Sequence, residues 1–363
     1  MDIAFFSIVQ WYCLIGILGI IIGFADSSKK VIYVGSRRIC TCQAFGLGIC
    51  CLIMSGLAAY RTNIGDTPNY TNIFRNTPIF WTDFKNFVTD RSEKGFYFLN
   101  YIIKKYIGDS SHIYLFITSF VIILGVIVFF YKYTEAAGMC LLIYILSGSY
   151  VSGMNGIRQS IVAATFAISV IFIREKKIIY YMLLCLILYT IHNSAIILIP
   201  MYWILNMKAW KKGSYILVGI TGILYVVYPV FASILVNLLQ GSTYEVYGNG
   251  IQNFTNGGAN IIRLLVLGLP IVLSFMFRKK IEKECQYFGM LLNGALMNFM
   301  FMLLATIRSW IFARFCMYFN VFSIALLVVC IKASEKNKKM LYVLCICFYL
   351  VFFYYEMRAT IGF

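Results

Sequence analysis

The sequence predicts an all-α polytopic membrane protein with about twelve helical segments. Three observations support this fold class. Hydrophobic residues make up 61% of the 363 residues, and charged residues make up 12%. Apolar runs long enough to cross a bilayer recur along the whole chain, and basic residues gather in the short segments between them. We therefore expect residues 1–363 to form a single integral membrane domain.

Continuous apolar runs mark the individual spans. The first run has no basic segment before it and no small-residue cleavage site, so we expect a retained helix rather than a signal peptide. Apart from the run 178–207, the predicted spans are 3–24, 42–60, 113–131, 136–152, 157–173, 214–236, 261–277, 287–306, 311–331 and 340–355.

The run 178–207 is too long for one span. As a single helix of about 1.5 Å per residue it would reach about 45 Å, whereas the hydrocarbon core is about 30 Å thick. A break at His192 would give two short helices and keep the later basic loops in the cytoplasm, where such loops are favoured. We therefore predict a broken hairpin at 178–207 and both termini outside. The basic residues that favour it are Lys29, Lys30, Arg37, Arg38, Arg174, Lys176, Lys177, Lys208, Lys211, Lys212, Arg278, Lys279, Lys280, Lys283, Lys332, Lys336, Lys338 and Lys339.

With this topology the segment 61–112 is an extracytoplasmic loop. Apolar side chains recur at helical spacing over 93–106, with lysines on the other side, which predicts an amphipathic helix lying on the outer membrane surface. The apolar positions are Phe96, Leu99, Ile102, Ile103 and Tyr106.

The net charge of +17 could indicate nucleic-acid binding or membrane topology. Basic residues in short loops between helices favour membrane topology over nucleic-acid binding, so we expect contact with membrane lipid and no nucleic acid.

The twelve cysteines show no CxxC spacing, and most lie in apolar runs, so we expect neither disulfides nor a zinc site. The phosphate-loop, dinucleotide-binding, GxSxG and HExxH patterns are missing from the sequence, and no cofactor is predicted.

Polar side chains converge on the predicted outer face. Ionisable groups in membrane spans are costly and are functional candidates by default. Together they predict an active site for a polar, anionic substrate. The set comprises Arg61, Asp66, Glu93, Asn155, Arg158, Gln159, His192, Asn193, Arg308 and Arg314.

Three arginines are candidates for binding an anion. Arg158 falls in the first turn of a predicted helix, where a cation is unfavourable unless an anion binds beside the free N–H groups. The alternative is an interfacial arginine that reaches toward lipid headgroups. Arg308 could likewise be an interfacial arginine that contacts lipid headgroups. Arg314 lies about two turns inside an apolar run, where contact with headgroups explains it less well.

Three residues are candidates for the catalytic base: Glu93, His192 and Asp66. Each has a structural alternative. Glu93 could be an acidic residue in the first turn of a helix, His192 could be a core histidine, and Asp66 could form a salt-bridged turn with Arg61. Glu93 ranks slightly above His192, because it has no fixed arginine partner in sequence and a hydrophobic helix beside it should raise its pKa. Asp66 is expected to position substrate. Paired carboxylates could hold Mg²⁺ or Mn²⁺, but no metal is predicted.

The ordered motifs resemble the EpsG-type family of Wzy-like bacterial polysaccharide polymerases over nearly the whole chain. The resemblance adds Tyr70 and Tyr318 to the candidate substrate-binding residues. The motifs are Arg61-x4-Asp66-x3-Tyr70, Glu93-x-Gly95, Asn155-x2-Arg158-Gln159, His192-x-Ser194-Ala195 and Arg314-x3-Tyr318.

The resemblance implies a GT-C-like glycosyltransferase in the bacterial plasma membrane, with its active site facing outside. Such enzymes join oligosaccharide repeat units carried on undecaprenyl diphosphate, for O-antigen, capsule or exopolysaccharide. A flippase or a chain-length regulator of the same pathway would be a partner. Three alternatives stay open: a flippase or transporter of lipid-linked sugars, a membrane O-acyltransferase with His192 as base, and a polysaccharide ligase.

Overall fold

The computed structural model describes residues 6–27, 31–34, 37–239, 259–307, 310–334 and 338–361. The chain forms two compact units, one of residues Met1–Tyr202 and Lys339–Phe363 and the other of Trp203–Lys338. The regular secondary structure of the described residues is helical apart from one antiparallel hairpin, β1 (Val31–Val34) with β2 (Arg37–Cys40), which was not predicted. The predicted helical architecture is confirmed.

Six described helices are long and apolar enough to cross a membrane, or up to nine if each bent pair is one span. Three shorter apolar helices accompany them, at Ile178–Ile191, Asn193–Ile204 and Lys212–Tyr228. The chain is therefore a multi-pass membrane protein.

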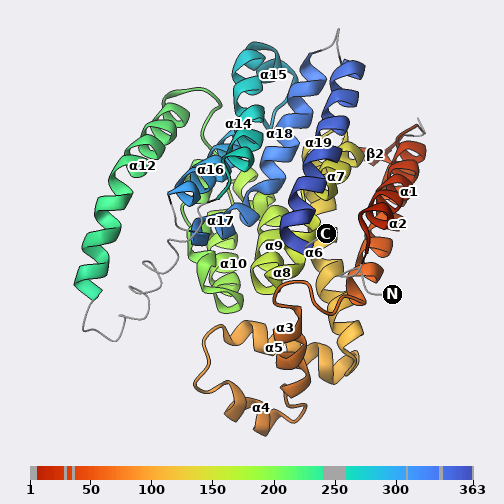
Figure 1. The fold of residues 1–363 in the computed structure, drawn as a ribbon, viewed down its shortest axis with the longest axis vertical. Helices are drawn as coiled ribbons and strands as arrows, with labels where there is room; N and C mark the ends of the chain where they lie inside the picture. Colours follow the sequence, from red (N-terminus) through yellow and green to blue (C-terminus); the bar gives the residue numbers. More distant parts are fainter. Residues whose placement is uncertain are drawn as a thin grey trace. The chain divides into compact units, whose positions relative to one another are not determined.

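The first unit contains the whole predicted outer loop, 61–112, and the helices around it (Figure 1). Its elements are α1 (Ile8–Ser27), α2 (Thr41–Ala59), α3 (Thr67–Asn76), α4 (Trp81–Val88), α5 (Lys94–Tyr106), α6 (Ser111–Tyr133), α7 (Ala137–Leu146), α8 (Ser149–Asn155), α9 (Ile157–Arg174), α10 (Ile178–Ile191), the 3₁₀ helix η2 (Asn193–Leu198) and α19 (Lys338–Ile361).

The second unit contains the remaining helices. They are α12 (Lys212–Leu239), α14 (Ile261–Met276), α15 (Arg278–Glu284), α16 (Phe288–Thr306), α17 (Trp310–Phe315), the 3₁₀ helix η3 (Cys316–Tyr318) and α18 (Asn320–Ala333). The short helix α11 (Met201–Ile204) lies at the boundary of the two units.

The break at His192 is confirmed. Helix α10 ends at Ile191, and His192 has extended backbone angles (φ −152°, ψ 121°). The chain then folds back. This is shown by the Tyr181 hydroxyl, which donates to the Leu198 carbonyl at 2.7 Å, and by the Tyr181 and Tyr202 rings, whose centroids are 5.8 Å apart. In a continuous helix, positions 181 and 202 would be about 31 Å apart.

Two of the predicted spans contain a break that was not predicted. The run 136–152 is broken between α7 and α8, which meet at 63° around Gly148 with its positive φ of 74°. Glycine adopts this left-handed conformation without a steric penalty. The run 311–331 is also broken, and its two helical parts, Phe312–Tyr318 and Asn320–Ala333, meet at 61°.

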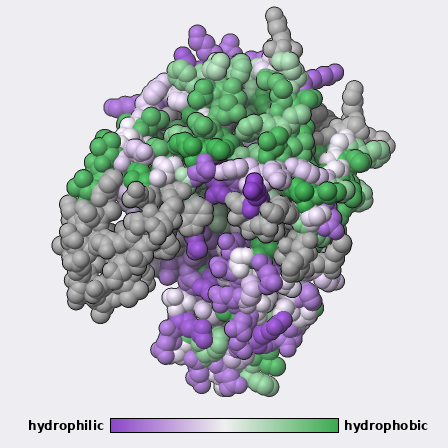
Figure 2. Space-filling model, in the orientation of Figure 1, coloured by the Kyte–Doolittle hydropathy of each residue, from purple (hydrophilic) through white to green (hydrophobic). Residues whose placement is uncertain are grey.

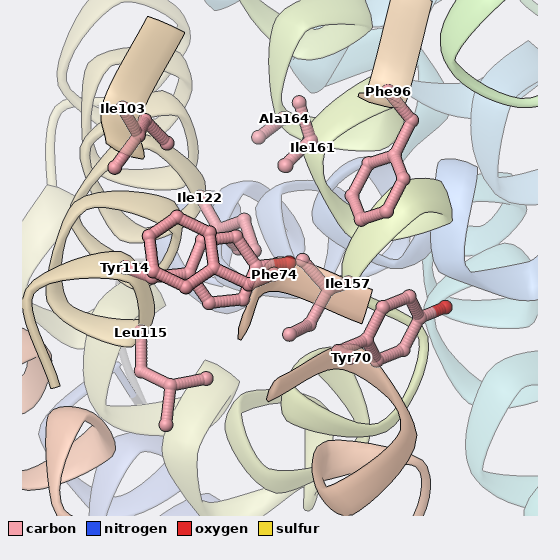
Figure 3. Close-up of a cluster of buried hydrophobic side chains, with 10 residues drawn as sticks. All are labelled: Tyr70, Phe74, Phe96, Ile103, Tyr114, Leu115, Ile122, Ile157, Ile161 and Ala164. Atoms are coloured by element: carbon pink, nitrogen blue, oxygen red, sulfur yellow. The ribbon is translucent and has the colours of Figure 1, made fainter. Parts of the chain in front are cut away.

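Helices α3, α4 and α5 form a lobe at one end of the first unit (Figure 1), and the visible face of this lobe is mainly hydrophilic (Figure 2). The predicted helix at 93–106 is confirmed, but its apolar side packs on protein. Phe96 and Ile103 are buried with Phe74 and Tyr114 in one cluster (Figure 3), whereas Tyr106 is exposed. The prediction that this side lies on lipid is therefore wrong.

A glycine sets the distance between the two central helices of this unit. A Cβ on Gly125 of α6 would lie 2.8 Å from both the Cβ and the carbonyl oxygen of Ala164 in α9. Because α6 and α9 are this close, the first turn of α9 is held against the lobe that α6 also supports.

Candidate functional site

Glu93 is the centre of the candidate site. It caps α5 in the left-handed conformation, with φ of 59°, which is uncommon for a residue with a side chain. Its carboxylate accepts hydrogen bonds from Arg158, from His192 Nδ1 at 2.6 Å, and from the Asn193 backbone N–H at 3.0 Å. Four residues predicted for the site are thus brought together from three separate parts of the chain.

The contacts around Glu93 determine its charge. Burial raises the pKa of the carboxyl group, but the hydrogen bonds from His192, Asn193 and Arg158 outweigh burial and lower the pKa to about 2. The expectation that a hydrophobic helix raises this pKa is therefore wrong, because Arg158 is a partner despite its distance in sequence. A carboxylate with so low a pKa is a weak base.

Arg158 lies in an aromatic cage in the first turn of α9. Its guanidinium carbon is 4.6 Å from the Phe96 ring centroid, 5.6 Å from that of Tyr97 and 5.7 Å from that of Tyr70. The side chain is 19% exposed, and Nη1 donates to Glu93. Cation–π contacts and the ion pair hold the guanidinium in one orientation.

The cage is continuous with the hydrophobic cluster below it. Figure 3 shows Tyr70, Phe96 and Ile157 side by side, with Phe74 and Tyr114 next to them. The Tyr70 and Phe96 rings pack edge to face, with their centroids 5.8 Å apart. Tyr70, a predicted substrate-binding residue, therefore supports Arg158 directly.

Asn155 fixes the turn before α3. Its side-chain oxygen accepts from the Asp66 backbone N–H at 2.9 Å. Gly65 has a positive φ of 51°, and a Cβ there would lie 2.1 Å from the same Asn155 oxygen. The Asp66 carboxylate is exposed beside this contact. Asp66 and Asn155 are thus adjacent, as the predicted site requires.

Arg61 has the geometry of an anchor. It is 2% exposed, and its guanidinium donates to the Ala58 carbonyl, the Ser119 hydroxyl and the Thr67 hydroxyl. It therefore ties the end of α2 to α6 and α3. Gln159, in the first turn of α9, is also buried, at 5% exposed. Direct substrate contact by either residue stays a prediction.

The second unit holds the other predicted residues. Arg314 is exposed near the end of α17, and Tyr318 is buried in η3. Arg308 lies outside the described residues. Their part in the site stays a prediction.

Other residues at the site were not among the predicted site residues, although Gly95 is part of the motif Glu93-x-Gly95. A Cβ on Gly95 would lie 2.1 Å from Thr190 Oγ1, so this glycine lets α5 approach the end of α10. Its place two residues after Glu93 was the available signal. Asn100 is fully buried in α5, and its amide has no hydrogen-bond partner in the described structure, as is also true of the Tyr114 hydroxyl. Nothing in the sequence pattern points to Asn100.

A metal bridging Asp66 and Glu93 does not fit this arrangement. Both Glu93 oxygens already accept from N–H donors, and two of these donors belong to basic side chains. Within the described ranges, no group of three or more His, Cys, Asp and Glu side chains is placed to hold a metal ion.

Comparison with known proteins gave one match. The EpsG family model matches residues 46–362, which include every predicted site residue. No curated protein and no solved structure matches the chain.

Proposed function

Because the chain belongs to the EpsG family, a family of Wzy-like polysaccharide polymerases, we propose that it joins undecaprenyl-diphosphate-linked oligosaccharide repeat units at the outer face of the bacterial plasma membrane. The observation that supports this most directly is the group formed by Glu93, His192 and Arg158. It combines a histidine oriented by a carboxylate with a fixed cation, at the end of α10 and the start of α9.

In the proposed reaction, His192 is the base. The acceptor sugar hydroxyl gives its proton to His192, and its oxygen attacks the anomeric carbon of the donor sugar. The bond from that carbon to the diphosphate oxygen breaks, and undecaprenyl diphosphate leaves with the bonding electron pair. Glu93 holds Nδ1 as a donor and stabilises the imidazolium that forms, as in other histidine–carboxylate pairs.

Arg158 is the proposed contact for the leaving diphosphate. A guanidinium has five N–H donors, and Glu93 accepts from Nη1. The first N–H groups of α9 have no partners within the helix and favour an anion at the same place. Charge that grows on the diphosphate in the transition state would be stabilised by these donors.

The remaining assignments belong to the same proposal. The fold is GT-C-like, the lobe of α3–α5 is outside, and Asp66, Asn155 and Asn193 position the acceptor sugar. Tyr318, Arg314 and Arg308 are further proposed substrate-binding residues. A flippase delivers the lipid-linked substrate, and a chain-length regulator is a further partner in the pathway.

The test is elongation in vitro. A deletion strain should accumulate single lipid-linked repeats on the outer leaflet, and these can be purified as substrate. The reconstituted protein should convert them into a ladder of longer chains, and His192→Ala should not. Transfer of a finished chain without lengthening would indicate a ligase. Accumulation on the inner leaflet would indicate a flippase, and full-length polymer lacking acetyl groups an acyltransferase.

A further inference from the structure

Trp81 and Phe98 are two of the exposed aromatic side chains of the lobe, which also include Phe80 and Tyr106. Trp81 of α4 is 47% exposed and Phe98 of α5 is 46% exposed. Both lean on the buried pair of Phe84 and Tyr101, with centroid distances of 5.7 Å from Trp81 to each and 6.3 Å from Phe98 to each. The buried pair, 4.6 Å apart, thus holds the two exposed rings in fixed positions.

Basic side chains accompany these rings. Lys85 Nζ is 5.4 Å from the Trp81 ring centroid. Lys105 Nζ donates to the Tyr101 hydroxyl at 2.7 Å and lies 5.2 Å from the Tyr101 ring. Lys85 and Lys105 thus place two ammonium groups beside the aromatic rings of this surface, and Asp83 is the acidic residue within α4 and α5.

The position of this surface favours a ligand from water over lipid. Helix α4 packs on α5, which in turn packs on α6 and α10. In Figure 1, α3 and α5 separate α4 from the ends of α8 and α9. Phe96 and Ile103, on the inner side of α5, are buried in the cluster of Figure 3. Helix α4, which carries Trp81, thus lies on the side of the lobe away from the ends of α8 and α9.

We propose that Trp81 and Phe98 form a platform that binds the saccharide chain, and that Lys85 and Lys105 select sugars bearing carboxylate or phosphate groups. The C–H faces of pyranose rings pack on aromatic rings, and ammonium groups pair with anionic substituents. The inference rests on the proposed polymerase function and names the substrate class as an acidic polysaccharide. The platform holds the chain outside the catalytic group.

Binding can be measured with the purified full-length protein. Tetragalacturonate is the acidic probe, and maltotetraose is the neutral probe of equal length. The tetragalacturonate should change tryptophan emission, and Trp81→Phe should remove that change. Trp203→Phe, which replaces another exposed tryptophan, should leave it intact. Maltotetraose should bind more weakly.

Two sets of variants separate the rings from the charges. Lys85→Gln and Lys105→Gln leave the rings in place, and each should weaken tetragalacturonate binding about two- to fivefold, the range for exposed ion pairs. Phe98→Ala should weaken binding about three- to tenfold. Equal binding of both probes, or no loss in the lysine variants, would overturn the acidic-saccharide assignment. Binding to phosphatidylglycerol vesicles that depends on Trp81 would instead make this face a membrane anchor.

Elongation assays distinguish this inference from the polymerase function. His192→Ala should bind tetragalacturonate normally while making no polymer. Trp81→Ala should still join repeat units but give shorter chains. Unchanged chain length with Trp81→Ala would overturn the platform and leave the polymerase intact. Absence of elongation in the wild type would overturn the polymerase, whatever the probe binds.

Discussion

His192 Nδ1 lies 2.6 Å from Glu93 Oε1, although 99 residues separate the two in the chain. The contact depends on two local conformations, the left-handed Glu93 before α5 and the extended His192 after α10. Neither backbone conformation occurs within a regular α-helix. Both conformations are needed to bring the two side chains into hydrogen-bond contact, so Glu93 and His192 are the first residues to mutate.

Replacing Glu93 tests its role as the residue that orients the base. Glu93→Gln removes the charge that stabilises the imidazolium, so elongation should fall about 100-fold or more. Glu282→Gln, the same change at an exposed carboxylate of the second unit, should have no effect. Substantial activity in Glu93→Gln together with loss in His192→Ala would leave His192 as the base without need of this carboxylate.

The low pKa of Glu93 predicts a pH dependence of stability. Its pKa is about 2 in the folded protein and about 4.3 in an unfolded chain. A lowered folded pKa stabilises the protein above pH 4.3, and this stability is lost as the pH falls toward 2. The Tm of the wild type should therefore drop more steeply than that of Glu93→Gln between about pH 5 and pH 3. Parallel curves would contradict the ionised contact.

Arg158→Ala should abolish polymer while the protein level is maintained. Arg158→Lys should rescue poorly, because an ammonium group cannot reproduce the planar stacking on Phe96. Arg174→Ala is the matched control, since Arg174 is exposed at the other end of the same helix. Normal polymer in the alanine variant would refute the diphosphate contact.

Gly95 offers a steric test of the site. In Gly95→Ala, the new Cβ would meet the Thr190 side chain and its backbone carbonyl carbon, the latter at 3.0 Å. Helices α5 and α10 should separate, and elongation should fall. Gly56→Ala places a Cβ in open space on α2 and should be tolerated. Full activity in Gly95→Ala would show that the close approach of α5 to the end of α10 is not needed for elongation.

Labelling can establish the topology of the hairpin. In a background without competing cysteines, Asn193→Cys should react with an impermeant thiol reagent from outside, because Asn193 is exposed. Lys176→Cys and Lys211→Cys should be protected. Labelling of the Lys211 position from outside would instead restore a single span through 178–207.

Hydropathy and loop charge predicted the helices well, because both act locally along the chain. The break at His192 followed from an apolar run longer than a bilayer. The break before Asn320 could not be predicted, since the run 311–331 shows no proline or glycine and suits a single span by length. The turn at Gly148 left one weak signal, a glycine in an apolar run.

The members of the site were predicted better than their contacts. Arg158, His192 and Glu93 were chosen because polar groups in apolar surroundings are costly. That Arg158 pairs with Glu93 depends on how α5 docks against α9, which a single sequence does not encode locally. The error in the Glu93 pKa has the same origin, because the partner is 65 residues away.

The shortness of α10 fixes the depth of the chemistry. Its 14 residues reach about 21 Å, so a helix that starts at one membrane surface stops about 9 Å short of the other. Under the proposed function, we therefore expect His192 to lie beneath the level of the lipid headgroups. A donor anchored by its isoprenoid tail would meet the base without being lifted from the bilayer. The acceptor sugar would instead have to move below the headgroup level to reach His192.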